Sequence, residues 1–275
     1  MSNSIEKILL FGSTGMLGNY IHTYFTKNTK IKVINVHYRI RQDTLDTLEE
    51  ILENSGIDKY TCIINCIGLI PQRKETKQND KDYFLINGLF PHVLWDVCKK
   101  YGAKMIQPTT DCVFSGKTGN YIESDIHDET NAYGMSKSLG EPNGSTIIRT
   151  SIIGLEKNNK KSFLEWVRSS NGKHINGWSN HMWNGITCLE YCHIIEQIIQ
   201  QNLFWSGVKH IYSPTPVSKY DMAQYIINTF TLDIEITPLI SQEPSDKTLS
   251  SIHETLFEIK ELELQINELK YFKLE

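Results

Sequence analysis

The stretch "KILLFGSTGMLG" (7–18) decides the fold: five mostly apolar residues are followed by three evenly spaced glycines. The run 7–11 predicts a buried strand, and a helix is expected to begin at Gly15. The spacing of Gly12, Gly15 and Gly18 allows a tight turn, close approach of the backbone to a phosphate, and close packing of the helix. The helix N-terminus adds free amide donors and a partial positive charge. The stretch therefore predicts a dinucleotide site at Gly12, Ser13, Thr14, Gly15, Met16 and Leu17.

Short apolar runs then alternate with longer amphipathic ones. Further strands are expected at 31–37, 61–67, 103–109, 145–153 and 208–213, and helices at 43–54, 81–101, from Tyr133 onward, 187–201 and 218–229. This alternation predicts βαβ units and a Rossmann-type, doubly wound parallel sheet. We expect 1–153, completed by 187–213, to form the nucleotide-binding domain. Residues 154–186 and 214–275 are expected to form a smaller substrate-binding lobe over the strand ends.

Composition excludes several functional classes. The 275 residues are 40% hydrophobic and 22% charged, as in ordinary globular proteins. A net charge of −4 with five arginines argues against a nucleic-acid partner. The longest apolar run, 62–70, is too short to span a bilayer, and no leader peptide is evident, so a cytoplasmic protein without a membrane partner is expected.

The six cysteines do not predict a disulfide framework. Cys188 and Cys192, with His193 next to the second, have a spacing that would let them share an ion on a helix. The apolar stripe of that helix, however, accounts for both cysteines as small core residues. We therefore expect no metal site.

The end of the second predicted strand indicates which cofactor is bound. The ribose 2′ position is normally read about 20 residues after the glycine motif, here in "VHYRIRQ" (36–42). No carboxylate precedes Asp43, whereas Arg39 and Arg41 are both present. Guanidinium groups bind a 2′-phosphate, so NADP(H) is expected in preference to NAD(H), with Arg39 as the leading contact.

The motif "YGMSK" (133–137) places Tyr133 and Lys137 on one face of a predicted helix. A lysine near a tyrosine favours phenolate and makes the phenol a better acid. Thr110 ends a predicted strand and would supply a hydroxyl that orients a carbonyl beside a nicotinamide. The three residues together predict a ketone reductase.

These motifs resemble those of the extended short-chain dehydrogenases/reductases, of the dTDP-4-dehydrorhamnose reductase kind. The similar stretches run from "GSTGMLG" through "NCIG" (65–68), "TTDCVFSG" (109–116) and "YGMSK" to "RTSIIG" (149–154). The resemblance implies that Thr110 is the catalytic hydroxyl, Tyr133 the proton donor and Lys137 the lysine that tunes it. It also implies cofactor contacts at Asp43, Thr44, Cys66, Ile67, Gly68 and Asn87, and substrate contacts at Thr110, Asn87, Gln72, His181 and Trp183.

The reaction implied is NADPH-dependent reduction of the C4 ketone of a nucleotide-linked 4-keto-6-deoxyhexose. The segment "GKHINGWSNHMWNGIT" (172–187) resembles reductase-like proteins of amino-deoxy sugars, so a UDP-linked N-acetylated sugar and a dTDP-sugar both stay open. The resemblance also implies a homodimer.

Cys112 has two interpretations. It is a small packing residue, or it faces the substrate with Thr110, since side chains two apart share one side of an extended backbone. The bifunctional epimerase/reductases of rhamnose synthesis carry a similar cysteine as an acid/base, for which an ordinary thiol pKa near 8.5 is suitable. Their partner lysine has no counterpart here, since Glu165 stands where it is expected.

Two other functions stay open. A nucleotide-sugar 4-epimerase or dehydratase would retain a tightly bound oxidised cofactor. A non-catalytic NADP-binding regulatory subunit, like that of methionine adenosyltransferase, would need no catalytic set. The presence of Thr110, Tyr133 and Lys137 together disfavours the regulatory reading.

Overall fold

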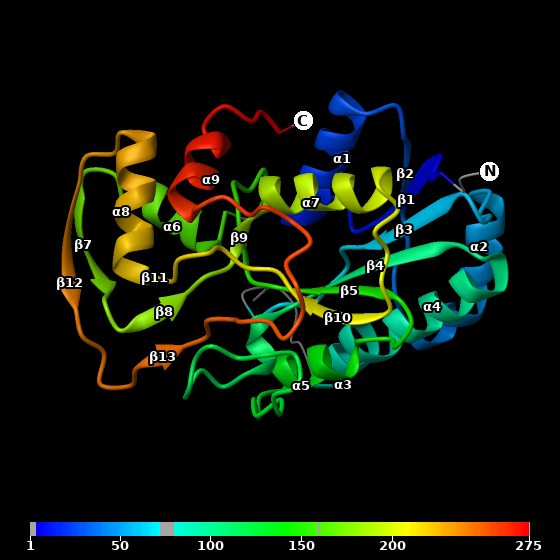
Figure 1. Cartoon of the computed structure of the whole chain (residues 1–275), viewed down its shortest axis with the longest axis horizontal. Coiled ribbons are helices and arrows are strands. Elements are labelled where there is room, and N and C mark those ends of the chain that lie inside the picture. The colour runs from blue at the N-terminus through cyan, green and yellow to red at the C-terminus, as the bar shows by residue number, and fades with distance from the viewer. Residues whose placement is uncertain (1–3, 72–79, 159, 275) are drawn as a thin grey trace.

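The computed structural model describes residues 4–71, 80–158 and 160–274, and its centre is a six-stranded parallel sheet (Figure 1). Each neighbouring pair of strands is parallel, as the alternating pattern predicts. In spatial order the strands are β10 (Gly207–His210), β5 (Thr146–Arg149), β4 (Lys104–Thr109), β3 (Thr61–Asn65), β1 (Lys7–Phe11) and β2 (Lys32–Val36).

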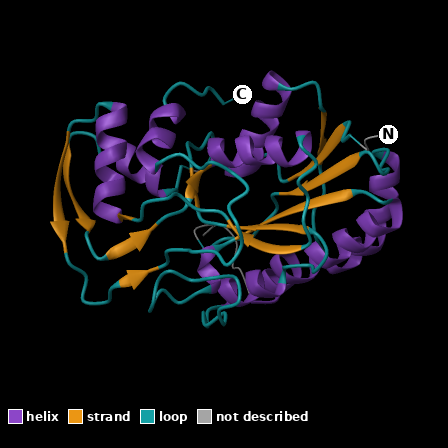
Figure 2. Ribbon diagram, viewed as in Figure 1, coloured by secondary structure: helices purple, strands orange, loops and turns teal. Residues whose placement is uncertain are grey.

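Helices cover both faces of this sheet (Figures 1 and 2). Ile8 and Leu10 pack with α1 (Met16–Asn28) and α7 (Cys188–Gln200), whereas Leu9 and Phe11 pack with α2 (Leu48–Asn54) and α4 (Phe90–Tyr101). Successive side chains of a strand point to opposite faces, so a strand buried on both sides is apolar throughout. The Rossmann-type α/β fold is therefore confirmed.

Two predicted helices are subdivided. The first half of 43–54 is a 3-10 turn, η1 (Gln42–Thr47), because the Thr44 hydroxyl bonds the backbone of Arg41 and competes with α-helical bonding. The predicted helix 81–101 contains α3 (Asp80–Tyr83), a π-helical turn η2 (Phe84–Leu89), and α4. Such turns are often found at functional sites, and this one carries Asn87.

The predicted strand 145–153 is divided in two. β5 ends at Arg149, and β6 (Ile152–Ile153) pairs instead with β9 (Ile186–Thr187). Ser151 accepts a hydrogen bond from the backbone N–H of Ile186 at 2.9 Å. The chain therefore leaves the main sheet at Thr150 and crosses towards the second lobe.

In the second lobe the predicted helix 218–229 is confirmed as α8 (Lys219–Phe230), whereas no strong pattern predicts the other elements. A parallel pair is formed by β7 (Lys173–Trp178) and β12 (Ile234–Leu239), and a three-stranded sheet by β11 (Val217–Ser218), β8 (His181–Trp183) and β13 (Ser245–Asp246). The helices are α6 (Phe163–Ser169), α8 (Lys219–Phe230) and α9 (Leu262–Leu269). One apolar cluster runs from Ile8 of the main sheet to Leu269 of α9, so the two parts share a core.

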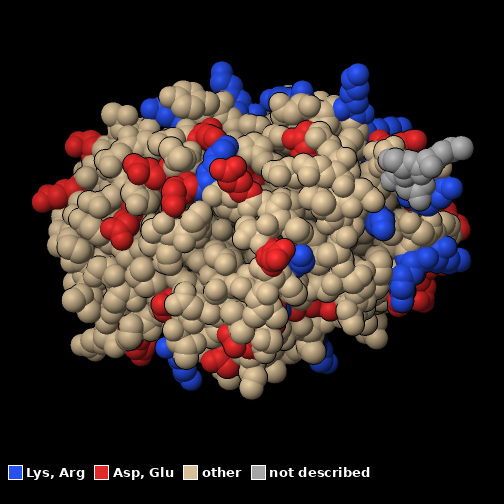
Figure 3. Space-filling view, in the orientation of Figure 1, with Lys and Arg blue, Asp and Glu red and all other residues tan. Residues whose placement is uncertain are grey.

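No helix in the described ranges is both long and apolar enough to cross a bilayer. On the face drawn in Figure 3, acidic and basic side chains are interspersed among uncharged ones.

Candidate active site

A cleft of about 1220 Å³ lies at the carboxyl ends of the strands. Its wall includes Gly15 of the glycine turn, Thr110 after β4 and Ser151 of the crossover. The second lobe contributes Phe163 of α6 and Trp183 of β8. A parallel sheet places its ligands at this edge, so the cleft is the candidate active site.

The glycine turn packs closely against the Cys66 backbone and the start of α1. Gly12 adopts a φ of 74°, and a Cβ there would lie 2.7 Å from the carbonyl carbon of Cys66. A Cβ on Gly18 would lie 2.1 Å from the Gly12 carbonyl oxygen, so Gly18 lets α1 approach the turn. Gly12 and Ser13 form the turn itself. The predicted residues that line the cleft are Thr14, Gly15, Met16 and Leu17.

Arg39 and Arg41 both line the cleft beside the glycine turn. Asp43 and Thr44, which the family resemblance implies as contacts, lie outside its wall. The Thr44 hydroxyl donates to the Arg39 carbonyl oxygen at 3.0 Å, and the Tyr38 hydroxyl donates to the Thr44 carbonyl oxygen at 2.5 Å. Thr44 therefore holds the loop that presents Arg39.

The three predicted catalytic residues line the same cleft. The Thr110 hydroxyl donates to Asp111 Oδ1 at 3.1 Å and accepts from the Cys112 backbone N–H at 3.1 Å. Tyr133 lies in the first turn of α5 (Ala132–Leu139), where the Asn131 side chain accepts from the Gly134 N–H and caps the helix.

Burial is the main influence on the pKa of Tyr133. Burial, with nearby Cys112, raises the pKa of Tyr133, so the phenol is protonated. Lys137 is not among the causes of this shift, and its effect on the acidity of the phenol stays a prediction. A Cβ on Gly68 would lie 2.9 Å from Lys137 Nζ, so the ammonium faces that loop. Burial lowers the pKa of Lys137 to about 8.

Asn87 lies behind the wall of the cleft and is buried. Its Oδ1 accepts from the Leu69 N–H at 2.8 Å, and its Nδ2 donates to the Leu69 carbonyl oxygen and to Ser136 Oγ. It therefore ties α5 to the loop of Cys66, Ile67 and Gly68, all three of which line the cleft. The resemblance implies that Asn87 contacts cofactor or substrate. In this structure Asn87 does not line the cleft.

Of the predicted sugar contacts, one lines the cleft and another lies outside it. Trp183 lines the cleft, but His181 does not: its ring stacks on Trp178 with centroids 5.6 Å apart, and its Nε2 lies 3.0 Å from the Glu243 carbonyl oxygen. Gln72 lies outside the described residues.

Cys112 lines the cleft, although the reason given for it is wrong. The chain turns into a 3-10 helix, η3 (Asp111–Val113), and is not extended between Thr110 and Cys112. The Sγ atom donates to Asp111 Oδ1 at 3.4 Å. Burial, with Asp111, raises the pKa of the thiol to about 12, so the assumed value near 8.5 is also wrong. The thiol is protonated at neutral pH.

The cleft is strongly basic although the chain is acidic. No motif predicts the cations of the second lobe, because only tertiary contacts bring them to the cleft wall. Its wall carries the cations Arg39, Arg41, Lys137, Lys157, Lys161, Lys219 and Lys247, against the acids Asp82 and Glu156. Such a surface attracts a ligand with several negative charges.

Arg149 is buried at the end of β5 and holds neighbouring side chains in place through hydrogen bonds. Its Nη2 lies 2.6 Å from Glu141 Oε2 and 2.8 Å from His127 Nε2, and its Nη1 donates to His210 Nε2 at 2.9 Å. The guanidinium also stacks over Phe114, two residues after Cys112. Burial and the adjacent Arg149 hold the pKa of His210 at about 4, so His210 is neutral.

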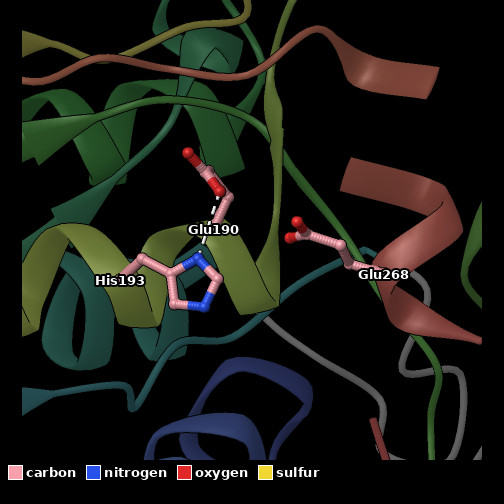
Figure 4. Close-up of side chains that lie close together, drawn as sticks. All are labelled: Glu190, His193 and Glu268. Atoms are coloured by element: carbon pink, nitrogen blue, oxygen red, sulfur yellow. Dashed lines mark hydrogen bonds and ion pairs between the residues drawn. The ribbon is translucent and has the colours of Figure 1, made fainter. Parts of the chain in front are cut away.

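Away from the cleft, Glu190, His193 and Glu268 lie close together (Figure 4). His193 Nδ1 is 3.2 Å from Glu190 Oε2. Lys260 Nζ is 2.5 Å from Glu268 Oε1 and 4.0 Å from Glu190 Oε2, so a lysine already neutralises these carboxylates. Cys188 and Cys192 of the same helix are fully buried in the apolar core.

Several known proteins are similar to this chain over most of its length. A dTDP-4-keto-6-deoxy-D-glucose reductase of Streptomyces niveus is 25% identical over 80% of this chain and 77% of its own. The methionine adenosyltransferase 2 subunit beta of Xenopus laevis is 25% identical over 88% of this chain and 78% of its own. The crystal structure of a dTDP-4-dehydrorhamnose reductase from Bacillus anthracis, in complex with NADP, superposes with a TM-score of 0.79 at 18% identity, covering 97% of this chain and 98% of that one.

The model of the RmlD substrate binding domain matches residues 6–258. That range contains the glycine turn, the three predicted catalytic residues and most of the second lobe. The chain belongs to the RmlD substrate-binding-domain family.

Proposed function

We propose that this protein is an NADPH-dependent reductase of the C4 ketone of a nucleotide-linked 4-keto-6-deoxyhexose. One observation carries the proposal: Thr110, Tyr133 and Lys137 share a single cleft with the glycine turn and Arg39. The reductase from Streptomyces niveus supports the reaction class. The first domain would hold the cofactor, and the second lobe the sugar.

The residues present fit NADPH. Gly12 lets the turn pack against the Cys66 backbone, and Gly15 presents the N-terminus of α1, with its amide donors, to the cleft. Arg39 and Arg41 suit a 2′-phosphate. The NADP complex of the Bacillus anthracis neighbour supports the same choice. When bound, NADPH supplies the hydride for the ketone carbon.

The protein's own groups supply the proton and hold the oxygen. The protonated phenol of Tyr133 donates its proton to the alkoxide oxygen as charge develops there. Thr110 holds the same oxygen once its hydroxyl rotates away from Asp111. Lys137, on the side of Gly68, gives positive charge that stabilises the phenolate left behind.

The basic wall fits a nucleoside diphosphate. Lys157 and Lys161 both line the cleft, and their positive charges suit the two negatively charged phosphates. Both dTDP and UDP carriers fit this chemistry, and a sugar with an N-acetyl group at C2 is proposed alongside the simple deoxysugar. Dimerisation remains an expectation from the family, testable by sedimentation.

The test is oxidation of NADPH, followed by absorbance, with dTDP- and UDP-linked 4-keto-6-deoxyhexoses. Tyr133→Phe should lower turnover by about 10²–10⁴ while leaving NADPH affinity unchanged. Tyr101→Phe is the matched control, because that hydroxyl bonds Glu49 and Glu53 outside the cleft. No turnover on any sugar, or normal turnover by Tyr133→Phe, overturns the proposal.

Two alternatives are read from the same experiment. The similarity to a methionine adenosyltransferase 2 subunit beta favours a regulatory NADP-binding protein if NADPH binds and no sugar is reduced. A 4-epimerase or dehydratase would instead purify with tightly bound oxidised cofactor, visible in its absorbance spectrum.

Epimerisation beside the ketone is a second candidate activity. The observation in its favour is that Cys112 lines the cleft next to Thr110 and keeps its proton. Glu165 does not supply the partner group, because its Oε1 accepts from the Glu156 N–H and pairs with Arg168.

A further inference from the structure

A second cavity lies at the edge of the main sheet where its strands begin. Its volume is about 290 Å³, and its wall is formed by the second half of α4, the first residues of β4 and β5, and the loop before β10. The cleft lies at the opposite edge of the sheet, and among the described residues none lines both cavities. The proposed reduction therefore makes no use of this second cavity.

Three aromatic side chains line the cavity: Trp95 of α4, and Phe204 and Trp205 of the loop before β10. The Trp205 ring is held by its Nε1, which donates to the Gly207 carbonyl oxygen at 3.0 Å. The loop itself is tied to β5, because the Thr146 hydroxyl donates to the Trp205 carbonyl oxygen at 2.8 Å and accepts from the Trp205 N–H at 3.2 Å. The aromatic wall is therefore formed before any ligand arrives, which lowers the cost of binding.

Trp95 offers a hydrogen-bond donor at this wall. Gly144 of the turn before β5 has a φ of 104°, and a Cβ there would lie 3.3 Å from Trp95 Nε1, so the indole N–H lies against backbone that lines the cavity. Within the part of the chain that the structure describes, the Trp95 indole has no hydrogen-bond acceptor within 3.5 Å. A tryptophan N–H that is removed from water normally has an acceptor, which a ligand in the cavity would supply.

The charged side chains at the cavity are basic. Of the described residues, Lys99 and Lys104 line it and no carboxylate does. Lys99 Nζ already lies 2.7 Å from Asp96 Oδ1. Lys104 Nζ lies 5.5 Å from the centroid of the Phe204 ring and has no described carboxylate within 4.0 Å. Lys104 can therefore pair with an anion that enters the cavity.

The size of the cavity restricts its ligand. Sites for small molecules commonly measure about 300–1,000 Å³, so 290 Å³ suits one small ring system, whereas the cleft of about 1220 Å³ suits a dinucleotide and a sugar. Aromatic walls favour a flat ring, which stacks on them or meets them edge-on. The Lys104 ammonium and the Trp95 N–H both favour a negatively charged acceptor.

We propose that this cavity is a second binding site, which takes a small planar aromatic anion such as an aromatic carboxylate. The ring of the ligand lies against Trp95, Phe204 and Trp205, and its carboxylate meets Lys104 and the Trp95 N–H. The site does not depend on the proposed function, because none of its residues takes part in the reduction. Since it lies at the far end of β4 from Thr110, both cavities can be occupied at once.

The test uses the five tryptophans of the chain as reporters. The full chain, labelled with ¹⁵N at the indole nitrogens, is titrated with indole-3-acetate, and the indole N–H signals are followed by NMR. The signals of Trp95 and Trp205 should move together, with a Kd of about 1 mM or lower. The signal of Trp183, which lines the cleft, should stay in place, with and without NADPH. A Trp→Phe variant at each position assigns its signal.

Two related ligands separate the contributions of charge and ring. Indole-3-ethylamine has the same ring with a positive charge, and cyclohexylacetate has the carboxylate without an aromatic ring. Each should bind about tenfold or more weakly than indole-3-acetate, because one lacks the bond to Lys104 and the other lacks the aromatic contact.

Lys104 variants test the pairing directly. Lys104→Met should weaken binding of indole-3-acetate by about tenfold or more, whereas Lys104→Arg should keep it, because the guanidinium also binds a carboxylate. Lys100→Met is the matched control: this lysine lies over the Tyr101 ring at 5.6 Å, outside the cavity, and its loss should leave binding unchanged. Thermal unfolding shows that each variant is folded.

Several results would overturn the proposal. If the Trp183 signal moves while those of Trp95 and Trp205 do not, the ligand lies in the cleft. Wild-type affinity in Lys104→Met, or equal binding of indole-3-ethylamine, removes the role of the anion. No movement of any signal at about 10 mM indole-3-acetate removes the site itself. Oxidation of NADPH by the same protein decides the proposed function separately, so either proposal can fail alone.

Discussion

Gly18→Ala should lower both the stability of the fold and the affinity for NADPH, because its side chain would press α1 against the glycine turn. The new Cβ would lie 2.1 Å from the Gly12 carbonyl oxygen and 2.7 Å from its carbon. Since non-bonded atoms prefer about 3.5 Å or more, the turn must retreat by roughly 1 Å. That retreat pulls on the hydrogen bond from the Gly15 N–H to the Gly12 carbonyl oxygen, now 3.0 Å long.

The magnitude follows from three contributions. Overpacking costs about 1–3 kcal/mol and a weakened hydrogen bond about 1 kcal/mol. The better helix propensity of alanine offsets about 1 kcal/mol. The net loss of about 1–3 kcal/mol corresponds to a Tm lower by about 2–10 °C for a chain of this size. Loss of one charge-assisted bond to pyrophosphate would weaken NADPH binding by about 10–100-fold.

Thermal unfolding and titration of NADPH by fluorescence measure both effects. Gly15→Ala is the comparison: its Cβ would meet its nearest neighbour, the Gly12 carbonyl oxygen, at 3.4 Å, an ordinary contact. It should therefore keep the wild-type Tm and lose only cofactor affinity, because Gly15 lines the cleft. A Gly18→Ala protein with the Tm and NADPH affinity of wild type would refute this reasoning.

Three further predictions concern charge. Arg39→Ala should raise the Kd for NADPH by about tenfold or more and leave that for NADH unchanged, because a charge-assisted bond to the 2′-phosphate is lost; equal effects on both cofactors would contradict the assignment. Arg149→Met should lower the free energy of unfolding by about 3–5 kcal/mol, since buried Glu141 loses its partner, as denaturant titration against Arg149→Lys will measure. Stability should fall as pH drops from about 6.5 to about 4, because the unfolded chain binds a proton that native His210 does not, and His210→Gln should flatten that part of the curve.

The sequence was most informative where a pattern is local. The glycine spacing and the alternation of apolar runs predicted the sheet, because each depends on a few adjacent residues. The helical spacing of Tyr133 and Lys137 likewise placed both at one cleft. The break of the strand at Thr150 was not predictable, since it depends on pairing with β9, more than 30 residues later.

Tertiary contacts account for what was missed in the site. The pKa of Cys112 depends on burial, which its local sequence does not reveal. Lys219 lies more than 100 residues after Cys112 and follows no recognisable motif, so only the fold shows that they share a wall. Asn87 was expected to contact cofactor and substrate but lies behind the cleft wall, because its amide bonds the backbone of Leu69.

The place of β10 at the edge of the main sheet has a consequence for synthesis. Its partner β5 ends at Arg149, yet β10 begins at Gly207, after the chain has passed through part of the second lobe. On the ribosome, the outer edge of β5 therefore stays unpaired until those later residues emerge. An open strand edge promotes association between chains. A nascent chain stalled before Gly207 is thus the form of this protein with most need of a chaperone.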